Sequence, residues 1–229
     1  GARYAKKIFV TSSEAASFFP EGKTEIYGNP VRALPEASTL ERPKEFPEGK
    51  KCVFITGGSQ GALGINRKIE ESIKEIIADT SLSVVWQVGS KHVESFQERL
   101  GNLPNVSIVG FVNNVYAYFQ YADLIVSRAG ASALAEILAF GKPSVLLPFP
   151  HATANHQEKN ARVVEKAGAA LVELDDEPNQ LWTKISDLLN NDTKRGQMAE
   201  QAKNLGMPDA ADRIAKAILK MEKYYAKNA

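Results

Sequence analysis

Four segments contain most of the residues of this sequence that could do chemistry, and each of them follows a predicted strand. They are Gly57–Gly61, Phe111–Asn114, Ser127–Glu136 and Pro148–Asn160. Glycines allow a backbone to approach a phosphate closely, and amide or carboxylate side chains can bind sugar hydroxyls. The four segments therefore indicate a site for a ligand that carries phosphate and sugar groups.

Ser127–Glu136 is the most informative of these segments. The small residues around Gly130 predict a sharp turn, and Ala131–Phe140 is predicted to be a helix. The N-terminus of this helix offers unpaired N–H groups and a positive dipole end, which favour a phosphate. Glu136 follows one turn later, where its carboxylate could accept two hydrogen bonds from a vicinal diol such as that of a ribose. The alternative is that Glu136 is a solvated helix residue.

Gly57–Gly61 reads Gly-Gly-Ser-Gln-Gly, with Ser59 at its centre, and directly follows a predicted strand. Its spacing differs from the G-x-G-x-x-G fingerprint of dinucleotide-binding folds, and no Gly-Lys-Ser/Thr follows as it would in a P-loop. The glycines still allow close approach to a phosphate at the start of a helix. A plain tight turn is the alternative.

The other two segments offer contacts to a base and to a sugar. The exposed backbone of Phe111–Asn114 could hydrogen-bond a base edge, although Asn113 or Asn114 could equally be an ordinary helix cap. Pro148–Asn160 presents amide and imidazole groups that could bind sugar hydroxyls. Its two histidines have no cysteine or carboxylate at the spacing of metal ligands, so a metal site is not predicted.

Three further charged residues complete the candidates. Arg32 follows Gly28-Asn29-Pro30-Val31, and an arginine at the mouth of a cleft suits a pyrophosphate. The alternative is a surface arginine in a linker. Asp175 and Asp176 follow a predicted strand and are interpreted as a solvated turn.

Alternating strands and helices must position these segments. The predicted fold class is α/β, a Rossmann-like parallel sheet with helices on both faces, in which ligands bind at the carboxyl ends of the strands. Strands are predicted at Lys7–Ser12, Thr24–Tyr27, Cys52–Thr56, Ser83–Val88, Val106–Val109, Leu124–Val126, Ser144–Pro148 and Ala170–Leu174. Helices are predicted along an isoleucine stripe from Ile65 to Ile77, and at Val93–Leu100, Val115–Tyr121, Ala131–Phe140, Asn155–Ala167 and, after Pro178, to the end of the chain. Ala33–Gly49 contains three prolines and is predicted to be a linker.

The composition of the chain excludes several classes of protein. The chain has 229 residues, is 44% hydrophobic and carries a formal net charge of +1, which argues against a nucleic-acid partner. Cys52 is the only cysteine, so no disulfide can form within the chain, and a buried thiol in a reducing cytosol is expected. The sequence has no transmembrane stretch or signal peptide and begins with glycine, which suggests that it starts inside a longer protein.

Five motifs together resemble the MurG family of glycosyltransferases. They are GNPVR (Gly28–Arg32), GGSQGALGIN (Gly57–Asn66), GFVNNV (Gly110–Val115), ADLIVSRAGAS…AE (Ala122–Glu136) and HQEKNA (His156–Ala161). The resemblance covers essentially the whole chain and implies the C-terminal half of the two-domain GT-B fold. It also implies an inverting transfer of N-acetylglucosamine from UDP-N-acetylglucosamine to undecaprenyl-linked muramyl pentapeptide, which converts lipid I to lipid II. This step belongs to peptidoglycan synthesis, and so to cell-wall biogenesis, cell shape and division.

The resemblance implies roles for particular residues. Arg32 and Ser59 would contact the diphosphate region or the sugar nucleotide, Val112 would present its backbone to uracil, and Gln157 would contact the N-acetylglucosamine hydroxyls. The helix would hold phosphate and ribose, with Glu136 on the ribose diol. The helix residues concerned are Ala131, Ser132, Ala133, Leu134, Ala135 and Glu136. Catalytic residues are expected outside this chain, and no metal or other cofactor is implied.

The resemblance also implies a domain organisation. Residues 1–32 would be a remnant of the N-terminal acceptor domain, 33–207 the UDP-N-acetylglucosamine-binding domain, and 208–229 a helix that returns to the N-terminal domain. Lipid I would bind through the missing domain, so the chain by itself is expected to hold the donor without transferring it. The full protein would be cytoplasmic and peripheral on the cytoplasmic face of an anionic plasma membrane.

Three alternatives stay open. The first is a UDP-N-acetylglucosamine 2-epimerase, which uses the same fold and donor, although the GGSQG and HQEKNA motifs favour a transferase. The second is a donor-binding subunit that works with a separate acceptor subunit. The third is a non-catalytic sensor of nucleotide sugars.

Overall fold

The structure is a computed structural model that describes residues 2–227, without the side chains of residues 13, 14 and 223–227. The chain divides into two compact units. The smaller comprises Gly1–Leu34 and Met207–Ala229, and the larger comprises Pro35–Gly206. All of the candidate segments except the one ending at Arg32 lie in the larger unit.

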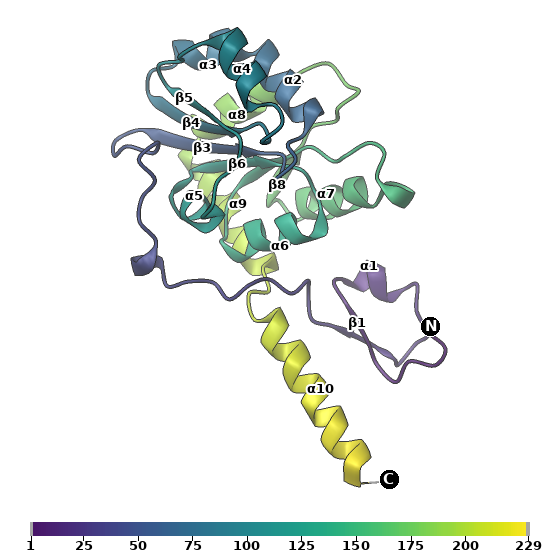
Figure 1. The fold of residues 1–229 in the computed structure, drawn as a ribbon. Helices are drawn as coiled ribbons and strands as arrows, with labels where there is room; N and C mark the ends of the chain where they lie inside the picture. Colours follow the sequence, from purple (N-terminus) through teal and green to yellow (C-terminus); the bar gives the residue numbers. More distant parts are fainter. Residues whose placement is uncertain (1, 228–229) are drawn as a thin grey trace. The chain divides into compact units, whose positions relative to one another are not determined.

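A six-stranded sheet forms the centre of the larger unit (Figure 1). Its strands are β3 (Lys51–Thr56), β4 (Leu82–Gln87), β5 (Val106–Val109), β6 (Leu124–Ser127), β7 (Ser144–Leu146) and β8 (Ala170–Val172). They are all parallel and lie in the order β5-β4-β3-β6-β7-β8. When the strands are numbered within this unit alone, their order is 3-2-1-4-5-6, which is the order of a doubly wound nucleotide-binding sheet. The predicted α/β fold class is confirmed.

Apolar strands explain why this sheet is covered on both faces. Every residue of β4 and of β6 is buried, as expected for strands with helices above and below them. Val53 of β3 pairs with Val84 of β4 on one side and with Leu124 of β6 on the other. β3 is therefore central, and the chain reverses its direction of winding between β3 and β6.

The helices lie in two layers (Figure 1). α2 (Leu63–Glu71), α3 (Ile73–Ala78), α4 (Val93–Leu100) and α8 (Leu181–Leu189) share one apolar core with the sheet. α6 (Ala131–Ala139) and α7 (His156–Lys166) share another on the opposite side, together with α9 (Asp192–Leu205). α5 (Val115–Tyr121) places Tyr118 against Phe54 of β3. The predicted isoleucine stripe is divided, because Ser72 leaves helical geometry between α2 and α3.

The segment predicted as a linker is packed for most of its length. Phe46 is fully buried and contacts the edge of the Tyr118 ring, and Leu40 is also buried. The Tyr121 hydroxyl donates a hydrogen bond to the Leu40 carbonyl. The larger unit therefore includes this segment from Pro35 onward, although its only regular structure is a 3-10 turn at Ala37–Thr39.

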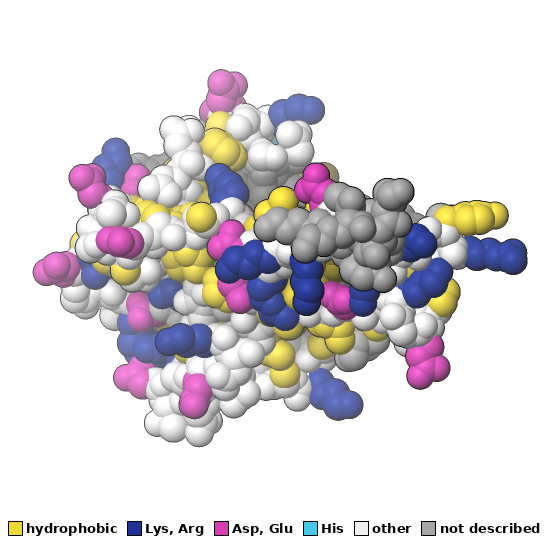
Figure 2. All heavy atoms as spheres, turned by 90° about the horizontal axis from the view of Figure 1, so that it is seen from below, with side chains coloured by type: hydrophobic (Ala, Val, Ile, Leu, Met, Phe, Trp, Pro, Cys, Tyr) yellow, Lys and Arg dark blue, Asp and Glu magenta, His cyan; other side chains and the backbone are white. Residues whose placement is uncertain are grey.

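The smaller unit contains β1 (Ile8–Val10), α1 (Ser13–Ala16), β2 (Thr24–Ile26) and α10 (Ala210–Lys227). β1 and β2 are parallel, and the Arg213 guanidinium of α10 lies 4.8 Å from the centre of the Tyr27 ring. Ile214, Ile218 and Met221 of α10 follow helical spacing, and this apolar stripe is only partly covered, since Ile218 is exposed. Figure 2 shows basic, acidic and apolar side chains interspersed on the face seen from below. No helix among the described residues is long and apolar enough to cross a membrane.

Candidate functional site

The point where the winding reverses places two predicted segments next to each other. β3 and β6 are neighbours in register up to Thr56 and Ser127. The turns that follow them are Gly57–Gly61 and Arg128–Gly130, so both leave the same edge of the sheet. In doubly wound sheets a ligand binds in the crevice that such a reversal opens at this edge.

The Gly57–Gly61 turn is fixed by close backbone contacts. Gly61 has a φ of +74°, and a Cβ on it would lie 2.0 Å from the Val88 carbonyl oxygen, so no other residue fits there. The Gly58 N–H donates to Thr56 Oγ1 at 3.0 Å, and the Gly58 carbonyl accepts from Gln87 Nε2 at 2.8 Å. Ser59 is left exposed at the turn.

The N-terminus of α6 is open to an anion. Gly130 is its N-cap and has no side chain to occupy the first N–H groups, and Ala131 and Ser132 are exposed. The first turn also contains no acidic residue, so nothing there repels a phosphate.

Gln157 faces the same turn from the start of α7. Its Oε1 accepts a hydrogen bond of 3.0 Å from the Phe149 N–H, which fixes the amide. Its Nε2 lies 3.9 Å from where a Cβ on Gly130 would stand. The structure thus brings the candidate residue Gln157 beside the α6 turn, although the two are 27 positions apart in the chain.

Glu136 and Val112 are both held by neighbouring side chains. The Tyr116 hydroxyl donates to Glu136 Oε1 at 2.9 Å, and Glu136 is only partly exposed. Glu136 is therefore an oriented carboxylate on α6. The Val112 N–H donates to Gln87 Oε1 at 3.3 Å. Gln87 thus links the loop after β5 to the Gly57–Gly61 turn.

Arg128 and Asp175 form a part of the site that the sequence did not predict. Two hydrogen bonds of 2.9 and 2.8 Å join the guanidinium to the carboxylate, and each side chain is 13% exposed. Arg128 also donates to the carbonyl oxygens of Leu147 and Pro148. The ends of β6, β7 and β8 are thereby joined by one side chain. The prediction of a solvated turn is wrong for Asp175, while Asp176 is exposed as predicted.

The Asp175 carboxylate also touches the first turn of α2. A Cβ on Gly64 would lie 2.1 Å from Asp175 Oδ2, so only glycine lets the carboxylate approach. An acidic group thus already lies beside the N-terminus of α2. The N-terminus of α6 has no such group, and it is the better of the two for a diphosphate.

A buried ion-pair network anchors the loop that carries Asp175. Glu173 accepts hydrogen bonds of 2.7 Å from both Lys68 of α2 and Lys184 of α8. Burial raises the pKa of Glu173, but the hydrogen bonds from Lys184, Lys68 and the Gln180 N–H outweigh it and hold the pKa below its usual value. Glu173 is therefore ionised near neutral pH and ties β8 to two helices.

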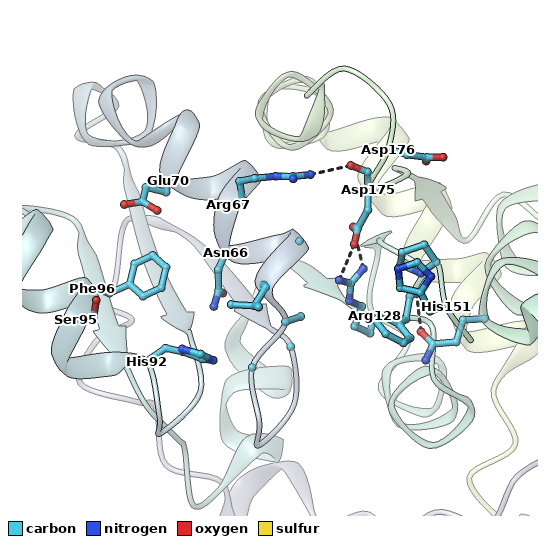
Figure 3. A pocket seen from close by; sticks show the side chains of 18 of the residues that line it. Asn66, Arg67, Glu70, His92, Ser95, Phe96, Arg128, His151, Asp175 and Asp176 are labelled. Carbon is cyan, nitrogen blue, oxygen red and sulfur yellow. Dashed lines mark hydrogen bonds and ion pairs between the residues drawn. The ribbon is translucent and has the colours of Figure 1, made fainter. Parts of the chain in front are cut away.

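A cleft of about 1210 Å³ runs along this edge of the sheet (Figure 3). It starts at Gln157, Gly57 and Gly61, passes Arg128 and Asp175, and continues over α2 to α4. Figure 3 shows Arg67 reaching toward Asp175, with His92 and Phe96 on the other side of the cleft. Ser59, Val112 and the Ala131–Glu136 residues do not line it. Of the candidate substrate-binding residues in the larger unit, Gln157 lines the cleft and the others do not.

The remaining candidate positions are Arg32 and the two histidines, His151 and His156, and they lie in different parts of the structure. Arg32 lies in the smaller unit, where it is exposed. His156 points its Nδ1 at the Thr153 carbonyl oxygen, 2.8 Å away, whereas His151 lines the cleft. Among the side chains that the structure describes, no group of three or more could hold a metal ion.

Fold and site together define a doubly wound α/β domain with a candidate ligand site where the order of its strands reverses. The model of the glycosyltransferase family 28 C-terminal domain matches residues 52–214. The chain belongs to this family. The predicted family resemblance is thereby confirmed.

Similar proteins carry more specific names. A Salinibacter ruber UDP-N-acetylglucosamine–N-acetylmuramyl-(pentapeptide) pyrophosphoryl-undecaprenol N-acetylglucosamine transferase is 36% identical over 99% of this chain and 62% of its own length. The solved structure of Acinetobacter baumannii MurG has a TM-score of 0.75 at 23% identity and covers 95% of this chain and 61% of its own. A putative UDP-N-acetylglucosamine 2-epimerase from Listeria monocytogenes reaches 0.65 at 17% identity, over 91% and 56%. The chain thus spans somewhat more than half of these proteins.

Proposed function

We propose that the chain is the donor-binding part of a transferase that moves N-acetylglucosamine from UDP-N-acetylglucosamine to a lipid-linked muramyl pentapeptide. The single observation that carries this is the similarity to transferases of that name over nearly the whole chain. The open N-terminus of α6 beside Gln157 and Glu136 supplies groups that suit a diphosphate, a sugar and a ribose. A role in peptidoglycan synthesis at the cytoplasmic face of a membrane follows from the same proposal.

Each candidate residue receives a role in this proposal. The N–H groups of the first turn of α6, at Ala131–Ala133, bind the diphosphate, since the Leu134 N–H already donates to the Gly130 carbonyl. The side chains of Ser59 and Arg32 contact the diphosphate region or the sugar nucleotide. Glu136, oriented by Tyr116, accepts hydrogen bonds from the ribose diol. The Val112 backbone binds uracil through its carbonyl oxygen, since its N–H donates to Gln87. The Gln157 amide binds the sugar hydroxyls.

The chemistry is an in-line displacement at the anomeric carbon. The acceptor oxygen forms a bond to this carbon as the bond to the β-phosphate oxygen breaks, and UDP leaves with the electron pair. Negative charge grows on the β-phosphate, where the N–H groups and dipole of α6 stabilise it. The acceptor proton must go to a base, which we place in the part of the longer protein outside this chain. Residues 1–32 and 208–229 are proposed to belong to, or return to, the N-terminal acceptor domain of that longer protein.

Titration calorimetry of the chain tests the donor site. UDP should bind more tightly than CDP, because a backbone that pairs with the uracil edge meets the wrong donor and acceptor pattern on cytosine. Equal affinities would contradict the proposed base recognition. For the longer protein, free N-acetylmannosamine formed without acceptor would favour the epimerase instead.

A further inference from the structure

The cleft extends well past the residues proposed to hold the nucleotide. Ligand pockets usually have volumes of about 300–1,000 Å³, and this cleft reaches about 1210 Å³ without including Val112, Ser132 or Glu136. It begins at Gln157, where the donor sugar is expected, and leads away over α2 to α4. Its far part therefore has room for something other than the donor.

Two arginines line the cleft along α2 and α4, and both are held in place by the protein. Arg99 donates to Glu70 Oε1 at 3.1 and 2.7 Å and to Ser95 Oγ at 3.0 Å, and its guanidinium lies 4.5 Å from the centre of the Phe96 ring. Arg67 donates to the Asp175 carbonyl at 2.9 Å. Their side chains are nevertheless 48% and 62% exposed. Since a guanidinium has five N–H groups, each arginine keeps donors for a ligand carboxylate.

The charges along the whole cleft balance. Three arginines line it, Arg67, Arg99 and Arg128, and so do three acids, Glu70, Asp175 and Asp176. This lining therefore has no excess of positive charge to attract a nucleic acid. Leu63, Phe96 and Phe149 add apolar surface between the charges. Such a mixed lining fits a short peptide, which presents amides, small side chains and one terminal carboxylate.

We propose that the cleft binds the peptide of the acceptor and holds its free carboxyl end at Arg67 and Arg99. This inference rests on the proposed function, because it identifies the acceptor as a muramyl peptide. Transfer requires the acceptor hydroxyl beside the donor sugar, and Gln157 lies at that end of the cleft. A peptide attached to the acceptor sugar can then extend along α2, away from the diphosphate.

Nuclear magnetic resonance of the chain, labelled with nitrogen-15 in its arginines, tests this placement. The probes are UDP, soluble N-acetylmuramyl pentapeptide, and the same peptide amidated at its carboxyl end. The pentapeptide should shift the Nε signals of Arg67 and Arg99 in the presence of UDP. Both amidation and Arg99→Gln should weaken its binding about tenfold, as expected for loss of a hydrogen bond between charged groups.

Arg162→Gln is the matched control, because Arg162 is 46% exposed and pairs with Glu158 and Glu165 much as Arg99 pairs with Glu70. It should leave peptide binding unchanged. Arg67→Gln provides a second test that does not depend on the Arg99–Glu70 pair, and thermal unfolding shows whether each variant is folded.

The outcomes separate this inference from the proposed function. Peptide signals confined to other arginines, or equal binding by the wild type, Arg67→Gln and Arg99→Gln, would overturn the cleft assignment even if UDP binds normally. Equal binding of the free and the amidated peptide would overturn it too. Failure of UDP to bind, with the arginine shifts intact, would instead contradict the donor site and leave the peptide cleft supported.

Discussion

Replacing Asp175 by asparagine tests the pair that joins the strand ends. Asp175 accepts two hydrogen bonds from Arg128, and both side chains are 13% exposed. Removing one partner of a buried ion pair costs about 3–5 kcal/mol, because the other charge is left unpaired. Two features reduce this cost. Asparagine keeps one oxygen as an acceptor, and Arg128 also donates to the carbonyls of Leu147 and Pro148. We expect Asp175→Asn to lower the free energy of unfolding by about 2 kcal/mol.

Urea denaturation followed by the fluorescence of the fully buried Trp86 measures this effect. In a domain of this size, the same loss lowers the melting temperature by about 4–8 °C. Asp176→Asn is the matched control, since this neighbouring carboxylate is exposed and its replacement should change stability by less than about 0.5 kcal/mol. If the two variants unfold at the same urea concentration, the Arg128–Asp175 pair does not stabilise the strand ends and the reasoning fails.

Three further predictions concern glycine packing, pH and thiol reactivity. Gly64→Ala should lower the free energy of unfolding by about 1–3 kcal/mol, because its Cβ would lie 2.1 Å from Asp175 Oδ2. A Cβ on Gly196 in α9 would meet nothing within 4 Å, so Gly196→Ala should raise the free energy of unfolding by about 0.5–1 kcal/mol. Equal urea midpoints for the two variants would contradict both glycine predictions. Because the pKa of Glu173 is lowered on folding, its stabilisation is complete above the unfolded pKa, near 4.5, and is lost as the pH falls below it. The stabilities of Glu173→Gln and wild type should therefore converge in acid, and a constant difference down to acid pH would argue against this. Burial raises the pKa of Cys52 to about 11, so a thiol reagent should modify it only as fast as the chain unfolds; rapid modification of the native protein would show otherwise.

Local patterns were sufficient to predict most of the fold. The strand Val106–Val109 and the helices Val93–Leu100 and Val115–Tyr121 have the bounds predicted for them. Each is determined by a short periodic stretch between turn residues, so neighbouring residues carry the information. The open helix N-terminus after Gly130 was predictable for the same reason.

Contacts between distant residues were not predictable in this way. Arg128 and Asp175 are 47 positions apart, and Lys68 and Glu173 are 105 positions apart. Each pair forms only because the strand order brings their loops together, and no local pattern encodes that order. An arginine directly after a buried strand was the one signal available, since burial requires a partner for its charge. The burial of Phe46 in a proline-rich stretch depends likewise on the distant Tyr118.

Calorimetric titration of UDP into the wild type and Glu136→Gln tests the central claim most directly. The substitution keeps an oxygen that can accept the Tyr116 hydrogen bond, so α6 should remain intact. If Glu136 binds the ribose diol, affinity should fall by about 1.5–3 kcal/mol, a tenfold or greater loss. Glu200→Gln, at an exposed position of α9, should bind UDP like the wild type. Unchanged affinity in a folded Glu136→Gln variant, or no binding of UDP by the wild type, would contradict the proposed donor site.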